Sequence, residues 1–215
     1  MKMANIIGLT GQTGAGKSSV REIMRQKGAA VIDADTVAHG ITENNLDCIY
    51  DIVSHFSCLV LNDKGTINRK ALGKRVFSDK KELAVLNKII FPYILDAVEH
   101  ETLEYIAKGA ENVVIDGATI IESGCGKLCD VLVSVVADSE TRTKRIIKRD
   151  GISQTDAERR VSAQKPEEFY TENSDYIIRN DGSFSELEHS VNAVLKNMLN
   201  KKETIAAEER FWEKL

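Results

Sequence analysis

Short, continuous apolar runs alternate with longer helical patterns along the chain. The runs cover residues 6–10, 29–32, 113–115 and 131–136, and a weaker fifth run covers residues 176–178. Within each run, apolar side chains follow one another without polar alternation. Strands that are covered on both faces have this pattern. The runs therefore predict buried strands of a mainly parallel sheet.

Helical patterns fill most of the stretches between these predicted strands. They cover residues 17–27, 80 to about 108, 140–148 and 183 to about 200. Asp79 with Glu82, and Ser183 with Glu186, form capping-box patterns at two of the helix starts. Pro92 lies inside the long helix, so we expect a kink or a break there. Strands that alternate with helices indicate βαβ units and an α/β fold.

Two stretches interrupt this alternation. Residues 35–91 contain helical segments but no convincing strand, and residues 150–171 are polar and charged. We expect the first stretch to be a helical insertion and the second to be a smaller helical excursion from the sheet.

The composition is that of a soluble globular protein. The 215 residues are 42% hydrophobic and 29% charged, and the formal net charge is −4. We expect neither nucleic acid nor an anionic membrane as a partner, so local cations must hold any anionic substrate. No apolar run approaches the ~20 residues of a membrane span, and the apolar stretch near the N-terminus is too short for a signal peptide. We therefore expect a cytoplasmic protein.

The four cysteines, Cys48, Cys58, Cys125 and Cys129, include no C-x-x-C pair. The spacing of Cys125 and Cys129 allows both to meet a metal on one helical turn. Reduced structural thiols are the expected alternative.

A phosphate-binding loop follows the first predicted strand directly. Residues 11–18, GQTGAGKS, fit the pattern G-x-x-x-x-G-K-[ST] and precede a helical pattern. Gly11, Gly14 and Gly16 allow the backbone to curl until successive N–H groups point at phosphate oxygens. The helix that begins near Lys17 adds the positive end of its dipole. The residues expected to contact ATP are Gly11, Gln12, Thr13, Gly14, Ala15, Gly16, Lys17, Ser18 and Ser19.

Three side chains of this loop have more specific expectations. Lys17 brings a mobile positive charge to the β- and γ-phosphates. The Ser18 hydroxyl is placed to bind Mg²⁺, which would accompany ATP as co-substrate. Ser19 is expected at the α-phosphate.

Acidic residues follow the second and third predicted strands. Asp33 and Asp35 end the run VIDAD, where one acid can accept a proton from an attacking hydroxyl and the other can position Mg²⁺ or substrate. A helix N-cap is the alternative for either residue. Asp116 ends the third run, and it can either contact the metal shell or form a turn with Gly117.

Two clusters of cations complete the candidate chemistry. Arg142, Arg145 and Arg149 follow the fourth strand on one helical face, where arginine can stabilise charge on a transferring phosphoryl group or simply face solvent. We assign this function to Arg145 and Arg149. The second cluster, in the helical insertion, can grip an anionic substrate or be a solvated surface. It contains Arg69, Lys70, Lys74 and Arg75.

Taken together, these residues resemble the dephospho-CoA kinase family over about residues 6–195. The most specific match is GLTGQTGAGKSS at residues 8–19, followed by VIDAD at residues 31–35. Further matches lie at residues 68–72, 76–77, 86–87, 136–145, 149–150, 160–164 and 175–182.

The resemblance implies ATP-dependent phosphorylation of the ribose 3′-hydroxyl of dephospho-CoA, with MgATP and dephospho-CoA as partners. It implies that Asp35 is the catalytic base and acts with Lys17 and Arg145. Arg145 and Arg149 begin a lid over ATP, and Asn180 and Gly182 lie near the adenine. On the acceptor side, the expected substrate-binding residues are Asp33, Arg69, Arg75 and Glu122.

The implied architecture is a single P-loop NTPase domain over residues 1–200, with three αβα layers and a mainly parallel five-stranded sheet. Residues 1–34, 110–149 and 172–200 form the core. A helical substrate lobe covers about 35–109 and a small lid covers about 150–171, and residues 201–215 form a charged C-terminal tail.

Two positions depart from the family pattern on the acceptor side. Phe91 stands where the family usually has histidine before a proline, and the stretch 116–122 keeps only the acid Glu122 of a Pro-Leu-Leu run closed by glutamate. A small-molecule or nucleoside-monophosphate kinase with another acceptor is therefore the alternative. An ATP-binding pseudoenzyme and a nucleotide switch are more distant ones.

Overall fold

The computed structural model describes residues 4–76 and 78–212, and it describes side chains up to residue 198. The chain forms two compact units. The first contains the chain up to Thr10 together with Gly28–Leu132, and the second contains Gly11–Lys27 together with the chain from Val133 onward.

All five predicted runs form strands, and each observed end lies within one residue of the predicted one. The order across the sheet is β2-β3-β1-β4-β5, and β1 pairs with β3, β3 with β2 and β4 with β5 in parallel. The boundary between the units falls inside β1, whose last residue belongs to the second unit. The strands are β1 (Asn5–Gly11), β2 (Ala30–Asp33), β3 (Asn112–Asp116), β4 (Val131–Val136) and β5 (Tyr176–Arg179).

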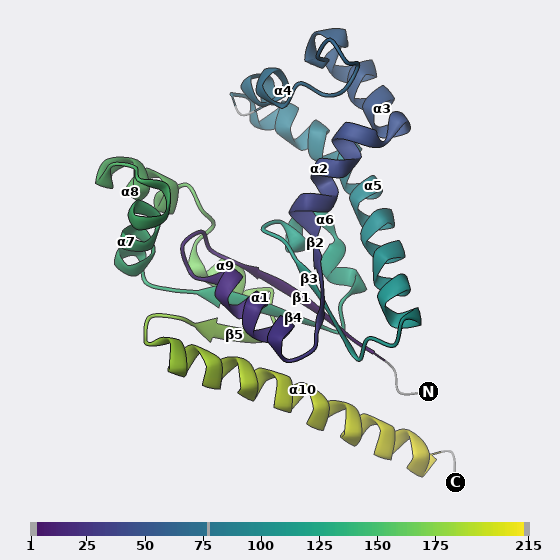
Figure 1. The fold of residues 1–215 in the computed structure, drawn as a ribbon, viewed down its shortest axis with the longest axis vertical. Coiled ribbons are helices and arrows are strands. Elements are labelled where there is room, and N and C mark those ends of the chain that lie inside the picture. The colour runs from purple at the N-terminus through teal and green to yellow at the C-terminus, as the bar shows by residue number, and fades with distance from the viewer. Residues whose placement is uncertain (1–3, 77, 213–215) are drawn as a thin grey trace. The chain divides into compact units, whose positions relative to one another are not determined.

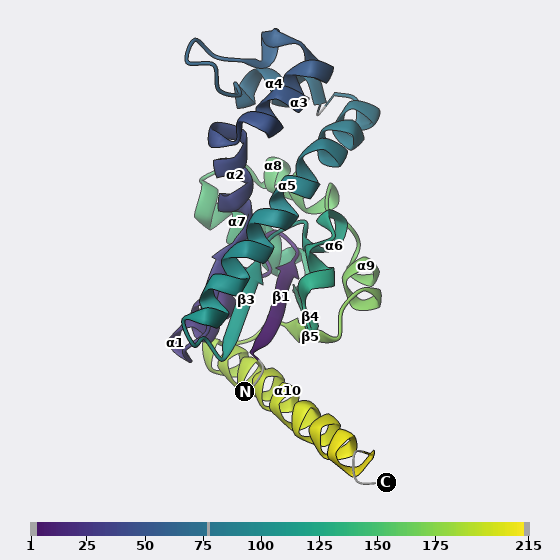
Figure 2. The same cartoon turned by 90° about the vertical axis from the view of Figure 1, so that its right-hand side faces the viewer.

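The first unit combines three strands with the predicted helical insertion. Its helices α2, α3 and α4 each pack against the long helix α5, which also contacts β2 and β3 (Figures 1 and 2). One apolar core joins the strands to the insertion, because Ile32 and Ile115 share it with Ile52 and Phe56. The helices are α2 (Ala34–Asn44), α3 (Leu46–Phe56), α4 (Arg69–Val76), α5 (Lys80–Ala107) and the short α6 (Ile120–Ser123).

The sequence predicted a kink or a break at Pro92; helix α5 continues through this residue, so the break does not occur. Proline removes the N–H that would bond to the carbonyl of Lys88. Both Pro92 and Lys88 are exposed, so water can replace the missing donor. The helix begins as predicted at Asp79, whose side chain accepts a hydrogen bond from the N–H of Lys81 over 2.8 Å.

The second unit holds the remaining strands and four further helices besides α1 (Lys17–Gln26) in its described part. Helices α7 (Ser139–Asp150) and α8 (Gln154–Ser162) pack against each other, and α9 (Glu167–Glu172) leads back to β5 (Figure 1). Helix α10 (Phe184–Trp212) packs against α1 and β5. We use the name lid for residues 150–172, which contain α8 and α9. The sequence predicted a helical excursion over residues 150–171, and its role as a lid stays a prediction.

The last helix begins as predicted but runs further than expected. Ser183 and Glu186 form the complete capping box: the N–H of Ser183 donates to Glu186 Oε2 over 2.7 Å, and the N–H of Glu186 donates to Ser183 Oγ over 3.3 Å. No glycine or proline occurs between residues 184 and 212, so the backbone stays helical to Trp212. The predicted tail is thus helical up to that residue, and its last part, residues 213–215, lies outside the described residues.

None of the helices within residues 4–76 and 78–212 combines the length and the apolar character of a bilayer span.

Candidate active site

The phosphate-binding loop has a backbone that only glycine accommodates at three points. Gly11, Gly14 and Gly16 have φ values of 154°, 83° and 96°. A Cβ atom at Gly11 would lie 2.4 Å from the carbonyl oxygen of Val135 on β4, and one at Gly14 would lie 2.8 Å from that of Arg142 on α7. The three glycines of the sequence motif are therefore needed both for the turn and for close approach to neighbouring segments.

Helix α1 starts inside this loop with nothing acidic at its N-terminus. Gly16 is the N-cap, no side chain caps the helix, and the first turn contains no acidic residue. Lys17 is half-buried and Ser18 is exposed. The helix N-terminus, its dipole and the Lys17 charge together form an environment suited to an anion.

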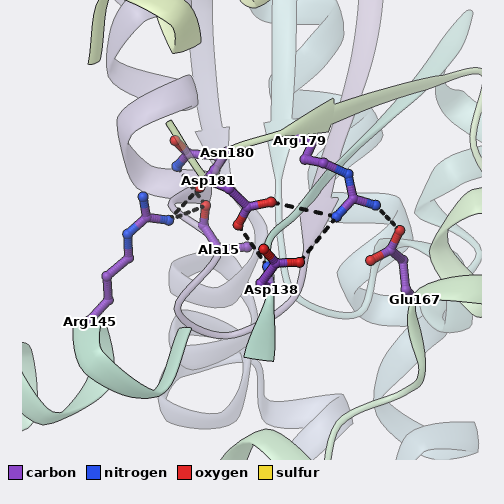
Figure 3. Close-up of polar contacts among 7 residues, drawn as sticks. All are labelled: Ala15, Asp138, Arg145, Glu167, Arg179, Asn180 and Asp181. Carbon is purple, nitrogen blue, oxygen red and sulfur yellow. Dashed lines mark hydrogen bonds and ion pairs between the residues drawn. The ribbon is translucent and has the colours of Figure 1, made fainter. Parts of the chain in front are cut away.

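Two side chains distant in the sequence hold the carbonyl group of Ala15 (Figure 3). Asn180 donates from Nδ2 to this oxygen over 2.7 Å, and Arg145 donates from Nη1 over 3.3 Å. The same Nη1 of Arg145 donates to the carbonyl oxygen of Asn180 over 2.8 Å. The structure thus brings Arg145 and Asn180 to the phosphate-binding loop, where both engage its backbone.

Thr13 is held in a similar way by two residues that the sequence interpretation did not assign to the site. Its N–H donates to Gln164 Oε1 over 3.0 Å, and its carbonyl oxygen accepts from Arg142 Nε over 3.1 Å. Arg142 is only 5% exposed, and this burial lowers the pKa of its guanidinium. Two sequence features could have pointed to these residues as part of the site. They are the helical spacing of Arg142 to Arg145 and the position of Gln164 in a family-matched segment.

Arg149, near the end of α7, contacts the acid that follows it in the sequence. Its guanidinium donates to both carboxylate oxygens of Asp150, over 2.7 and 3.0 Å, and Asp150 also pairs with Arg160 on α8. The hydrogen bond from Arg149 lowers the pKa of Asp150, and the same bond raises the pKa of Arg149. Asp150, which Arg149 holds, is the residue that connects α7 to Arg160 on α8.

A second ionic cluster, also missed from the sequence, surrounds Arg179 at the end of β5 (Figure 3). Arg179 forms an ion pair with Glu167, the first residue of α9, and lies 3.7 Å from Asp138 and 3.6 Å from Asp181. Asp181 also accepts the N–H of Asp138 over 2.7 Å. The cluster thus connects the start of α9 to the segment that contains Asn180.

Gly182, expected near the adenine, has a clear local reason to be glycine. A Cβ atom there would lie 2.3 Å from Glu186 Oε2, which closes the capping box of α10. Gly182 is exposed, whereas Asn180 is buried.

In the first unit, the acidic residues of β2 and β3 lie side by side. Asp33 is in register with Asp116, and Asp116 is in register with Leu9 on β1. Asp33 is the N-cap of α2 and accepts the N–H of Thr36 over 2.9 Å, so the capping alternative holds for this residue. Asp35 lies in the first turn of α2 with an exposed side chain and is not the cap.

The helical insertion places the predicted acceptor-side cations in different settings. Arg69 donates to the carbonyl oxygen of His39 over 2.9 Å and borders a cavity of about 650 Å³ that Lys64 also lines. Arg75 donates to the carbonyl oxygen of Phe56 over 2.9 Å and stacks over the ring of that residue, so its contacts are within the insertion. Glu122 is exposed in α6.

The residues present fit a magnesium ion that arrives with a nucleotide. Within the described residues, no group of three or more His, Cys, Asp or Glu side chains could hold a metal. Mg²⁺ commonly binds through one or two protein oxygens and takes its other ligands from phosphates and water. Ser18 is exposed at the start of α1, and it offers such an oxygen.

Cys125 and Cys129 are free thiols, and Cys129 Sγ donates to the carbonyl oxygen of Cys125 over 3.4 Å. Burial raises the pKa of Cys129 to about 12. Both features are those of structural thiols.

The family model for dephospho-CoA kinase matches residues 5–186. This chain belongs to the dephospho-CoA kinase family. A dephospho-CoA kinase from Halalkalibacterium halodurans is 35% identical over 191 residues, which cover 89% of this chain and 95% of that protein. The family expectation made from the sequence is therefore confirmed.

Solved structures agree with this assignment to the dephospho-CoA kinase family. A Thermus thermophilus structure matches with a TM-score of 0.73 and 30% identity, covering 91% of this chain and 98% of that one. A dephospho-CoA kinase from Campylobacter jejuni matches with a TM-score of 0.65 and 26% identity, covering 93% and 100%. The expected P-loop α/β fold with its five-stranded sheet is confirmed.

Proposed function

We propose that this member of the dephospho-CoA kinase family transfers the γ-phosphoryl group of ATP to the ribose 3′-hydroxyl of dephospho-CoA, which yields coenzyme A and ADP. The observation that carries the proposal is the glycine loop of residues 11–16. Its conformation is fixed by Asn180 and Arg145, and it leads into a helix N-terminus free of acidic residues. Such a loop presents backbone amides to a triphosphate.

On the ATP side, the backbone from Gly11 to Ser19 would surround the phosphates and Lys17 would contact the β- and γ-phosphates. Arg145 uses only Nη1 in its hydrogen bonds to the described residues, so Nε and Nη2 remain for a phosphate oxygen. Ser18 would hold Mg²⁺, which supplies charge neutralisation on the phosphates when it is bound. Arg149, Asn180 and Gly182 complete the proposed nucleotide site.

Asp35 is the proposed general base. The carboxylate of Asp33 accepts the Thr36 N–H at the helix N-cap, whereas Asp35 presents an exposed carboxylate from the first turn of the same helix. An exposed carboxylate can accept the proton of the 3′-hydroxyl as the oxygen attacks phosphorus. Asp33 then orients the first turn of α2 that carries the base.

On the acceptor side, Arg69 is the strongest candidate for contact with the anionic part of dephospho-CoA. It borders the 650 Å³ cavity together with Lys64. Arg75 and Glu122 are the further substrate-side candidates. We propose that the enzyme acts in the cytoplasm, on small molecules, without nucleic acid or membrane partners.

The test is an ADP-release assay with MgATP and, in parallel, dephospho-CoA, adenosine and nucleoside monophosphates as acceptors. We expect turnover with dephospho-CoA alone, and we expect mass spectrometry and ³¹P NMR to locate the new phosphate on the 3′-oxygen. The Lys17→Ala variant, which lacks the phosphate-binding charge, is the inactive control. Faster turnover with a nucleoside monophosphate would assign the alternative acceptor and overturn the proposal.

A further inference from the structure

Thr13 is the point where a side chain of the lid and a side chain of α7 reach the phosphate-binding loop. Gln164 accepts its N–H, and Arg142 donates to its carbonyl oxygen. Arg142 Nη2 also donates to the carbonyl oxygen of Val161, over 3.5 Å, and the Gln164 N–H donates to the same oxygen over 3.3 Å. The two residues that hold Thr13 are therefore connected through Val161. The orientation of the Thr13 backbone therefore depends on where the end of α8 lies.

Residues 164–167 lie between α8 and the start of α9, and side-chain contacts hold this segment at both ends. Gln164 bonds to Thr13. Glu167 pairs with Arg179, the neighbour of Asn180 (Figure 3). Asn180 in turn holds Ala15. A displacement of this segment would consequently act on the loop on both sides of Gly14.

Other side-chain pairs of the lid connect lid residues to one another. Asp150 pairs with Arg160, Gln154 bonds to Glu158, and Arg159 pairs with Asp156. These pairs lie within residues 150–160, so they stabilise the lid itself. Gln164, between α8 and α9, bonds to the phosphate-binding loop through its side chain.

We propose that Gln164 is a positioning residue for the nucleotide. Its amide oxygen fixes the Thr13 peptide, and this orients the following amides of the loop toward the phosphates. The inference rests on the proposed ATP-binding role of the loop, but it does not depend on the identity of the acceptor. Gln164 does not itself contact a reacting atom in this account.

The experiment compares full-length Gln164→Met and Gln164→Glu with a matched control, Gln154→Met. Methionine has a similar length but no acceptor for the Thr13 N–H, whereas glutamate keeps one. Gln154 is exposed and on the same lid, and it bonds only within α8. Amide hydrogen exchange at Thr13 by NMR, ATP binding by calorimetry and steady-state kinetics are measured for each.

We expect Gln164→Met to speed exchange at Thr13 and to raise the Kd and the KM for ATP about 2- to 12-fold, the range for losing one neutral hydrogen bond. The kcat at saturating ATP should stay within about twofold, because no interaction with the transition state is removed. Gln164→Glu should keep Thr13 protected, and Gln154→Met should behave as the parent protein.

Unchanged exchange at Thr13 in Gln164→Met, or an equal effect of Gln154→Met, would overturn the proposal. Exchange and calorimetry need no acceptor, so they give an answer even if dephospho-CoA is not phosphorylated. A failure of the acceptor assay would therefore contradict the proposed function alone.

Discussion

Asn180 donates a hydrogen bond from Nδ2 to the carbonyl oxygen of Ala15 over 2.7 Å, although 165 positions separate the two residues in the sequence. The Asn180 backbone N–H donates at the same time to the carbonyl oxygen of Val136 on β4. One buried residue thus connects the end of β5, the neighbouring strand and the phosphate-binding loop.

Replacing Asn180 with alanine should weaken ATP binding and stability together. The change removes the donor to Ala15, so we expect the Kd for ATP to rise about 2- to 12-fold and the free energy of unfolding to fall by about 1–3 kcal/mol. Calorimetry and urea denaturation measure these two quantities. Asn173→Ala is the control, because this exposed amide bonds only to the carbonyl oxygen of Phe169, and its effect should be within about 0.5 kcal/mol.

Gly16→Ala should disrupt the loop more severely. The new Cβ would lie 2.2 Å from Asn180 Nδ2, and alanine would have to adopt φ near 96°. Left-handed backbone alone costs about 1–2 kcal/mol for a residue other than glycine. We expect ATP binding to weaken more than ~10-fold, which corresponds to ~1.4 kcal/mol or more. Calorimetry with ATP measures this.

Gly40→Ala is the matched comparison for that substitution. Gly40 lies inside α2, and a Cβ there would meet nothing within 4 Å. Alanine should therefore stabilise the protein by about 0.5–1 kcal/mol, since it favours helix. Equal effects of the two substitutions on ATP binding would contradict the role given to Gly16.

Asp35→Asn should separate catalysis from nucleotide binding. Loss of a general base lowers turnover by about 10²- to 10⁴-fold, while ATP affinity should stay within a few-fold. Steady-state kinetics with dephospho-CoA and calorimetry with ATP give the two values. Asp47→Asn, in the exposed first turn of α3, should leave both values near those of the parent protein. Turnover retained by Asp35→Asn would exclude Asp35 as the base.

Glu186→Gln should reduce the loss of stability that the protein shows as pH falls from neutral to acidic values. Hydrogen bonds from the Ser183 N–H and then from the Ser183 hydroxyl hold the pKa of Glu186 below its ordinary value of 4.5. A carboxyl whose pKa is lower in the folded state stabilises the protein above its unfolded pKa, and this contribution disappears as pH falls through the folded pKa.

The Tm difference between the parent protein and Glu186→Gln should therefore be largest near neutral pH and should shrink below pH 4.5. Thermal melts monitored by circular dichroism from neutral to acidic pH measure it. Glu188→Gln, on the same helix, should show a smaller difference at neutral pH, since its contact with Lys27 is a long, exposed ion pair at 3.9 Å.

The sequence predicted the strands closely because each apolar run carries its own signal. Burial on both faces requires continuous hydrophobicity, and Asp33 and Asp116 mark where two of the strands end. The glycine loop was also predicted, from its sequence motif. The structure gives the reason for its three glycines, because a Cβ atom at each would lie too close to backbone or side-chain atoms.

Tertiary contacts explain what the sequence did not reveal. Arg142 and Gln164 both act on Thr13, which lies 129 and 151 positions away, and the local signals around these two residues do not specify that partner. Arg179 likewise gathers partners from the ends of two strands and from the lid. Local rules also allowed a break at Pro92, because they do not record that Pro92 and Lys88 are exposed.

The fixed carbonyl groups of Thr13 and Ala15 have a thermodynamic consequence for association with ATP. A flexible glycine-rich loop would lose conformational entropy when a ligand ordered it, and that loss would subtract from affinity. In this protein, side chains from α7 and from the segment after β5 restrict the loop backbone during folding. We therefore expect the nucleotide to meet a preorganised cradle, whose affinity depends in part on the side chains that hold the loop backbone.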